Sequence, residues 1–167
     1  MRPQLAIHFP GPYDLWCVVQ REDSLAAELA DGHYSRQTPG ADGFMPPGFC
    51  VAFVHHGPTG SAVWSAVFNV FRDVWRWRNT IFRNKSGTLS SSLISAATNA
   101  TYLEWARVYG WMPIARLTSE IDIEATRSRR SKRHEPGHCY REAGWREVSR
   151  RRREHGRPAC VVLEAPR

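Results

Sequence analysis

The sequence predicts a single domain of the α/β or α+β class, in which a central mixed β-sheet is flanked by helices. The chain has 167 residues, a length typical of one domain, so the expected domain is 1–167. Its residues are 42% hydrophobic and include seven Trp and seven Phe, which is enough for a core and excludes a wholly disordered chain. Strand-like and helix-like segments alternate, and a long helix lies between strands.

The first third of the chain predicts a strand, a helix and a loop. Residues 14–20 (DLWCVVQ) form a short apolar run of strand type. Residues 22–34 (EDSLAAELADGHY) have acids in the first turn and Gly32 near the end, which predicts a helix. Residues 35–48 are rich in Pro and Gly and predict a loop.

The middle of the chain predicts a β-hairpin and a third strand. The hairpin strands are 49–56 and 61–70, and Gly-Pro-Thr-Gly between them is a turn by composition. In residues 75–84, aromatic or aliphatic residues alternate with Arg or Asn, a period of two that indicates a strand. We expect Trp75 and Trp77 in this strand to fill the core, rather than to stack on an unpaired base.

A long helix is predicted over residues 86–110, with Gly110 as its C-terminal cap. Its apolar residues recur at spacings of three and four: Leu89, Leu93, Ala96, Ala100 and Leu103. The remaining expected elements are a strand over 114–122, a basic loop, a short helix over 137–145 and a last strand over 158–165.

Positive charge is concentrated in residues 127–157. The whole chain carries +7, whereas this segment holds twelve Lys or Arg against four Glu, an excess of +8. Such a patch favours an anionic partner, and double-stranded DNA is the expected one, although a solvated arginine surface is the alternative. The residues expected to bind the phosphate backbone are Arg127, Arg129, Arg130, Lys132, Arg133, Arg150 and Arg151.

The four cysteines lie far apart and form no CxxC pair, which predicts reduced thiols in a cytosolic protein. No apolar stretch reaches the roughly 20 residues of a membrane span, so no membrane partner is expected. His33, Asp122 and His138 would be a mixed set suited to iron or manganese, but no ligand spacing supports a metal site.

Two motifs resemble the GNAT family of N-acetyltransferases. Residues 139–148 (CYREAGWREV) resemble the late segment of that family, in which a short helix carries a Tyr and is followed by Gly, an aromatic residue and a strand. The resemblance implies that Tyr140 is a general acid, which gives its proton to the leaving thiolate of the acyl carrier. The alternative is a tyrosine that only packs against the sheet.

The second motif is the segment FRNKSGTLSSSLISAA (82–97), which takes the place of the GNAT phosphate loop between a strand and the long helix. The resemblance implies that this segment holds a small-molecule group donor such as acetyl-CoA, because the N–H groups at a helix N-terminus bind anions. The implied residues are Arg83, Asn84, Ser86, Gly87 and Ser90. The family pattern has a second glycine that this chain lacks.

Three segments together resemble the Mom-type DNA modification proteins of phages, a variant GNAT-like group: GHYSRQTPGADGFMPPG, RNKSG and PGHCYREAGW. The resemblance implies transfer of an acyl or carbamoylmethyl-type group to an exocyclic amine of a DNA base, which protects DNA from restriction. It also implies that the cytosol is that of a bacterial or phage-infected cell. Such an enzyme would flip or unpair its target base.

Four further residues are expected beside the cleft of such an enzyme. His33 and Tyr34 close the first helix next to a loop, and Glu120 and Asp122 share one face at the end of a strand. His33 could act as a base, or only interact with the helix dipole, and the two acids could activate an amine or pair with arginines. Two other functions stay open: acetyl-CoA-dependent transfer to a small-molecule or protein amine, and non-catalytic DNA binding.

Overall fold

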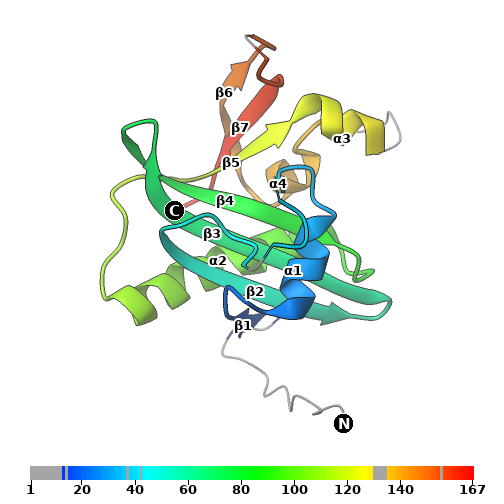
Figure 1. Ribbon diagram of the computed structural model, residues 1–167, viewed down its shortest axis with the longest axis vertical. Coiled ribbons are helices and arrows are strands. Elements are labelled where there is room, and N and C mark those ends of the chain that lie inside the picture. Colours follow the sequence, from blue (N-terminus) through cyan, green and yellow to red (C-terminus); the bar gives the residue numbers. More distant parts are fainter. Residues whose placement is uncertain (1–12, 14, 37, 42, 130–134, 155) are drawn as a thin grey trace, which may run out of the picture.

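A computed structural model describes residues 13, 15–36, 38–41, 43–129, 135–154 and 156–167. In this part of the chain, seven strands form one mixed sheet in the order β1-β2-β3-β4-β5-β7-β6 (Figure 1). The strands are β1 (Cys17–Val19), β2 (Phe49–Gly57), β3 (Gly60–Phe71), β4 (Val74–Asn84), β5 (Leu117–Asp122), β6 (Arg146–Arg151) and β7 (Cys160–Glu164). Strands β4 and β5 are parallel, and the other neighbouring pairs are antiparallel. The mixed α/β class predicted from the sequence is confirmed.

Helices cover both faces of this sheet. The described helices are α1 (Ser24–Asp31), α2 (Ser90–Tyr109), α3 (Ile123–Arg129) and α4 (His138–Glu142). Figure 1 shows α1 in front of the sheet and α2 behind it. Because neighbouring strand residues point to opposite faces, Phe53 and Trp64 pack in the core against α2, whereas Val54 and Val63 pack in the core against α1. The sheet therefore has one core on each face.

Several predicted elements are shorter in the structure than the sequence pattern suggests. The strand expected over 14–20 is only β1, and the strand expected over 114–122 begins at Leu117. The helix expected over 22–34 begins at Ser24, because the Asp23 side chain caps it by accepting a 2.8 Å hydrogen bond from the Ala26 N–H. The long helix ends before Gly110, as predicted.

Two elements were not expected from the residue pattern. The segment after β5, expected as a basic loop, begins as the short helix α3. The strand β6 follows Trp145 and pairs with β7. All six of its residues are exposed, so it lacks the alternation of buried and exposed side chains that identifies a strand in a sequence.

The break that positions the functional site lies between β4 and β5. Their parallel pairing covers three residue pairs, from Trp77 opposite Leu117 to Asn79 opposite Ser119, and then stops. A β-bulge lies at this point of β4, because Ser65 of β3 pairs with Ile81 and Ala66 pairs with Asn79, which leaves Thr80 as an extra residue. The bulge turns Ile81 toward the core against α1, whereas Trp77 packs against α2.

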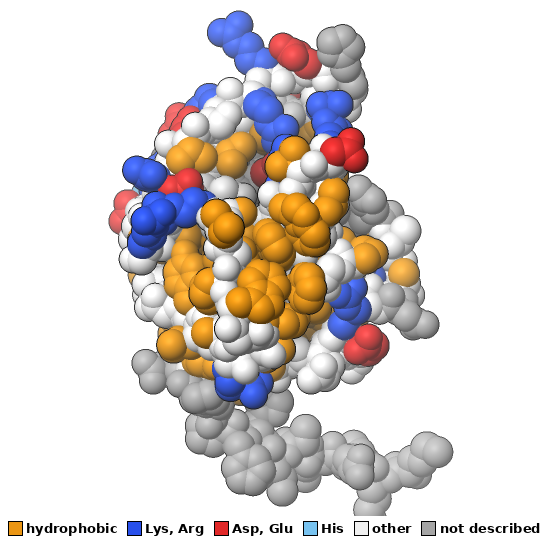
Figure 2. Space-filling model, turned by 90° about the vertical axis from the view of Figure 1, so that its left-hand side faces the viewer, with side chains coloured by type: hydrophobic (Ala, Val, Ile, Leu, Met, Phe, Trp, Pro, Cys, Tyr) orange, Lys and Arg blue, Asp and Glu red, His pale blue; other side chains and the backbone are white. Residues whose placement is uncertain are grey.

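Apolar side chains gather on one exposed face, which Figure 2 shows in orange. Trp111 contacts Phe49 and Phe68 with ring centroids 5.4 and 5.7 Å apart, and Trp75 stacks on Phe68 at 4.8 Å. The expectation that both tryptophans of β4 fill the core is correct for Trp77, which is 2% exposed, and wrong for Trp75, which is 54% exposed. Trp75 lies near the tip of the β3–β4 hairpin, at the second residue of β4.

Candidate functional site

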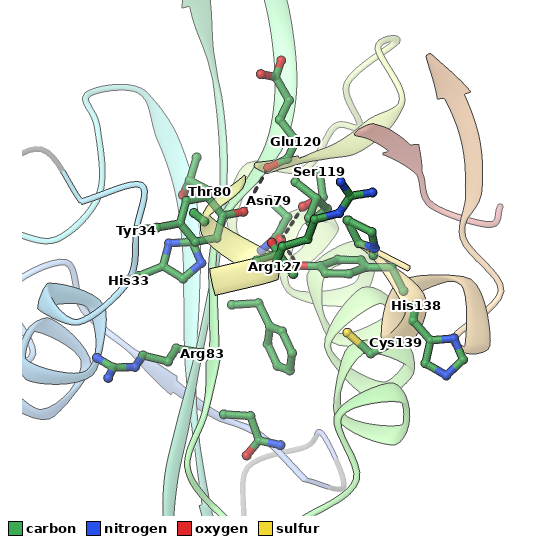
Figure 3. A pocket seen from close by; sticks show the side chains of 18 of the residues that line it. His33, Tyr34, Asn79, Thr80, Arg83, Ser119, Glu120, Arg127, His138 and Cys139 are labelled. Carbon is green, nitrogen blue, oxygen red and sulfur yellow. Dashed lines mark hydrogen bonds between the residues drawn. The ribbon is translucent and has the colours of Figure 1, made fainter. Parts of the chain in front are cut away.

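A cleft of about 810 Å³ opens where β4 and β5 separate. Its walls come from both strands, from α3, from α4 and from the segment after α1 (Figure 3). This cleft joins residues that are far apart in the sequence: His33, Tyr34, Asn79, Glu120, Arg127 and Tyr140. The sequence predicted five of these six as functional residues, and the structure brings them to one place.

Asn79 is the centre of the buried part of the cleft wall. Its side-chain Nδ2 donates to the backbone oxygens of Ser65 and Ile81, both at 2.9 Å. Its Oδ1 accepts from the Tyr140 hydroxyl at 2.6 Å and from the Ser119 hydroxyl at 3.1 Å. All four hydrogen-bonding positions of the amide are therefore used, which holds β3, β4, β5 and α4 together at this point.

Tyr140 is held by its ring as well as by its hydroxyl. It is 4% exposed and packs against Trp64, Phe82 and Trp145. Burial raises the pKa of its phenol well above the usual value, so the hydroxyl keeps its proton over the whole physiological range. Proton donation to a leaving group would require the hydroxyl to give up its hydrogen bond to Asn79.

The glycines beside Tyr140 explain the Gly-aromatic pattern of this segment. Gly137 has a φ of 80°, and a Cβ there would lie 2.6 Å from the Leu163 side chain, so a larger residue could not begin α4 in this position. After α4, Gly144 has a φ of 86°, and the chain turns so that the Trp145 N–H donates to the Tyr140 carbonyl at 3.0 Å. Both glycines thus serve the placement of Tyr140 and Trp145.

Tyr34 bridges the segment after α1 to the free edge of β5. Its hydroxyl donates to the Glu120 carbonyl at 3.3 Å and accepts from the Asp122 N–H at 3.4 Å. Burial raises the pKa of Tyr34 to about 12, so this phenol is neutral. The neighbouring His33 ring lies 4.3 Å from the Tyr34 ring and contacts Ser35 through Nδ1 at 2.7 Å. Both residues were predicted beside the cleft and lie there.

The two acids of β5 have structural partners. The Glu120 carboxylate accepts from Arg151 at 2.7 Å and from Arg76 at 3.5 Å, and Figure 3 shows its side chain pointing away from the other labelled residues. The Asp122 carboxylate accepts from the Ala125 N–H at 2.8 Å and so caps α3. The sequence left two roles open for these acids, activation of an amine and pairing with arginines, and Glu120 pairs with arginines.

At the start of the segment predicted to hold the donor (82–97), the polar groups hydrogen-bond to one another. The Asn84 side chain accepts from both the N–H and the hydroxyl of Ser86, and donates to the Thr88 carbonyl and the Ser90 hydroxyl. Ser86 is buried, whereas Gly87 is exposed, and the N-cap residue of α2, Leu89, makes no side-chain capping hydrogen bond. Anion contacts in this segment would therefore come from Gly87 and the first N–H groups of α2.

The Arg83 side chain binds to α1 and does not point into the centre of the cleft. Its Nη1 donates to the Leu29 carbonyl at 2.9 Å, and Figure 3 shows the side chain pointing toward α1. A Cβ at Gly32 would lie 1.3 Å from the same Nη1, so this close approach needs a glycine.

A second hollow, of about 1360 Å³, lies on the other side of the same break. We call it the arginine groove, because seven arginines line it against three acids: Arg36, Arg72, Arg78, Arg150, Arg151, Arg152 and Arg157, with Glu120, Asp122 and Glu154. The cleft and the arginine groove share four lining residues: Tyr34, Asn79, Thr80 and Glu120. Arg72, Arg76 and Arg78 also lie over the Phe71 ring, 4.6 to 5.4 Å from its centroid.

The predicted phosphate-binding residues do not all lie together. Arg150 and Arg151 line the arginine groove, whereas Arg127 lines the cleft. Arg130, Lys132, Arg133 and the side chain of Arg129 lie outside the described residues.

Within the described residues, no three His, Cys, Asp or Glu side chains are grouped to hold a metal, so His33, Asp122 and His138 do not form a site. No described helix combines the length and apolarity that crossing a membrane requires.

Sequence reasoning missed Asn79, Ser119 and the arginines of the β3–β4 hairpin. A signal for Asn79 is present, since it takes a position in β4 where the alternation from Trp75 and Trp77 predicts an apolar side chain. A buried amide at such a position requires hydrogen-bond partners, and those partners come from strands that only the fold brings near.

Comparison of the chain with protein-family models, with curated proteins and with solved structures finds no match in any of the three.

Proposed function

We propose that this protein transfers a small acyl-type group from an activated donor to an exocyclic amine of a DNA base. One observation carries the proposal: the cleft and the arginine groove meet at one break in the sheet, with Tyr34, Asn79, Thr80 and Glu120 in both linings. A cleft of about 810 Å³ has the size of a small-ligand site, and an adjoining positive groove suits a phosphate backbone.

The arginine groove would hold the strand whose base enters the cleft. Arg152 and Arg157 are exposed on the β6–β7 side, and Arg72 is exposed at the β3–β4 hairpin, so charge flanks the opening from two elements. A base inside a duplex cannot reach a cleft wall, and the target would therefore leave its stack. Contacts to phosphates position the strand without reading its sequence.

The donor would lie along β4 toward the start of α2. The cleft extends to Asn84 and Lys85, just before the exposed Gly87 and the uncapped first turn of α2. These groups suit a phosphate-bearing donor, of which acetyl-CoA is one example. The reactive end of such a donor would then point toward Tyr140 and the amine.

The transfer itself forms one bond and breaks another. The amine nitrogen attacks the acyl carbon of the donor, a C–N bond forms, and the bond between the acyl carbon and the leaving group breaks. The amine loses one proton and the leaving group takes one. The candidate groups for these proton movements are the His33 ring and the Tyr140 hydroxyl, because both line the cleft. Tyr140 would first have to release its hydrogen bond to Asn79.

Nucleoside mass spectrometry tests the proposal. The protein is expressed in a bacterium and, in parallel, incubated with DNA and acetyl-CoA, and the DNA is then digested to nucleosides. We expect a nucleoside of added mass whose yield falls about 100-fold or more in Tyr140→Phe. Tyr102→Phe is the matched control, since its hydroxyl donates to the Pro166 carbonyl and neither residue lines the cleft. DNA that is bound but carries no added mass in either experiment would contradict the enzyme and leave a DNA-binding protein.

A further inference from the structure

The orientation of the Asn79 amide is settled by its neighbours. Two backbone carbonyl oxygens, of Ser65 and Ile81, lie 2.9 Å from Nδ2. Carbonyl oxygens only accept hydrogen bonds, so the NH2 side of the amide must face them, since a flipped amide would place three oxygens against one another. Oδ1 therefore points to Tyr140 and Ser119.

This orientation fixes the protons of two hydroxyl groups in the cleft wall. Oδ1 carries no proton, so both the Tyr140 hydroxyl, at 2.6 Å, and the Ser119 hydroxyl, at 3.1 Å, must act as donors to it. A hydroxyl has one proton, and each of these is then committed to Asn79. Any lone pairs that Tyr140 and Ser119 present to the cleft can only accept hydrogen bonds.

We propose that Asn79 is a specificity-determining positioning residue: by holding both hydroxyl protons, it leaves the Tyr140 and Ser119 hydroxyls as acceptors only toward the cleft, so that these two groups select a neutral amino group and reject a carbonyl. The inference rests on the proposed function and deepens it. At the position where adenine and cytosine carry an amino group, guanine and thymine carry a carbonyl oxygen. An N–H placed against these two hydroxyls would donate to Tyr140 or Ser119, whereas a carbonyl oxygen placed there would face two oxygens whose protons Asn79 holds.

The proposal gives Tyr140 a role different from proton donation to a leaving group. The two roles compete for the same hydroxyl, because a proton held by Asn79 is not available to the donor's leaving group. In the acceptor role, Tyr140 orients the amine by one of its N–H bonds and leaves the nitrogen lone pair for the attack. Sites built to bind an N–H discriminate strongly against analogues that lack it, since the buried acceptors are then left unpaired.

Binding of nucleoside analogues, followed by ligand-detected NMR, tests this selectivity without requiring turnover. The pairs adenosine against inosine and cytidine against uridine exchange an amino group for a carbonyl at one position. N6,N6-dimethyladenosine removes both N–H groups and keeps the base. We expect the wild type to prefer the amino member of each pair by about tenfold or more. The preference should fall toward unity in Tyr140→Phe/Ser119→Ala and stay unchanged in Tyr102→Phe.

Two further measurements keep the role of Asn79 separate from folding. Asn79→Ala should lose the amino preference if it stays folded, as checked by thermal denaturation. In the wild type, the Tyr140 hydroxyl proton should give a slowly exchanging NMR signal that is absent from Tyr140→Phe, and this measurement needs no ligand. Equal binding of adenosine and inosine, a preference that survives the double substitution, or the absence of that signal would overturn the proposal. Failure of every nucleoside and of DNA to bind would overturn the proposed function itself.

Discussion

The cleft and the arginine groove meet at the same break in the sheet, but they are built in opposite ways. The wall of the cleft is buried and every hydrogen-bonding group of Asn79 has a partner. Five of the seven arginines that line the arginine groove are on exposed positions, and several of the seven are in ion pairs such as Arg151 with Glu120. In a buried hydrogen-bond network, the loss of one member leaves its partners without hydrogen bonds and lowers stability. In an exposed cluster of like charges, the loss of one side chain changes stability little.

The largest expected difference between the two regions is in stability. Asn79→Ala should lower the free energy of unfolding by about 3 kcal/mol, because it leaves two carbonyls and two hydroxyls of the wall without their partner. Asn69→Ala is the matched change on the groove side, where the amide donates to the Pro47 carbonyl and accepts from Arg78. We expect it to cost less than about 1 kcal/mol. Urea denaturation measures both, and equal losses would contradict the comparison.

The next effect in size is on DNA affinity. Arg152→Gln and Arg157→Gln, in the arginine groove, should each reduce the slope of log affinity against log salt by about 1, because each removes one phosphate contact. Arg146→Gln is the control, since Arg146 pairs with Glu164 and does not line the groove. Fluorescence anisotropy with labelled DNA at several salt concentrations gives the slopes. An unchanged slope in both groove variants would remove the groove from DNA binding.

The smallest expected effect is on the anchoring of β6. Hydrogen bonds from Arg150 and Arg141 lower the pKa of Glu147 to about 2 from an ordinary 4.5. Because the folded-state pKa is depressed, the stabilisation is present above about pH 4.5 and is lost as the pH falls toward 2. Glu147→Gln should therefore cost less than about 1 kcal/mol at pH 6 and clearly less at pH 2, where roughly half of the carboxylates are protonated. Urea denaturation at the two pH values measures this, and an equal cost at pH 2 would assign it to packing.

The local elements were largely predictable from the sequence. The helix α2 was predicted from its apolar spacing and has Gly110 as its C-terminal cap, although Leu89 and Leu103 of that spacing are exposed. The hairpin β2–β3 has turn residues between two apolar runs. These features depend on neighbours within a few residues, so a pattern in the chain records them. No residue pattern predicts β6, although the resemblance of residues 139–148 implied a strand there, because its six exposed residues become a strand only by pairing with β7.

The candidate site was predictable in part. Tyr140, His33, Tyr34, Glu120 and Asp122 were named from the sequence, and all but Asp122 line the cleft. Asp122 lines the arginine groove instead and caps α3. The partners that decide the chemistry of Tyr140 were not predictable, because Asn79 and Tyr140 are 61 residues apart in the chain and meet only in the folded sheet.

The sequence by itself determined the mixed α/β class, most helices and strands, and the concentration of positive charge in residues 127–157, because these follow from local pattern and composition. The tertiary structure alone decided where β4 and β5 separate and which hydroxyls Asn79 orients. It also decided that the bulge at Thr80 turns Ile81 toward α1. The reason is that strand register and the pairing of buried polar groups are set by packing between distant segments, and that packing leaves no periodic trace in the chain.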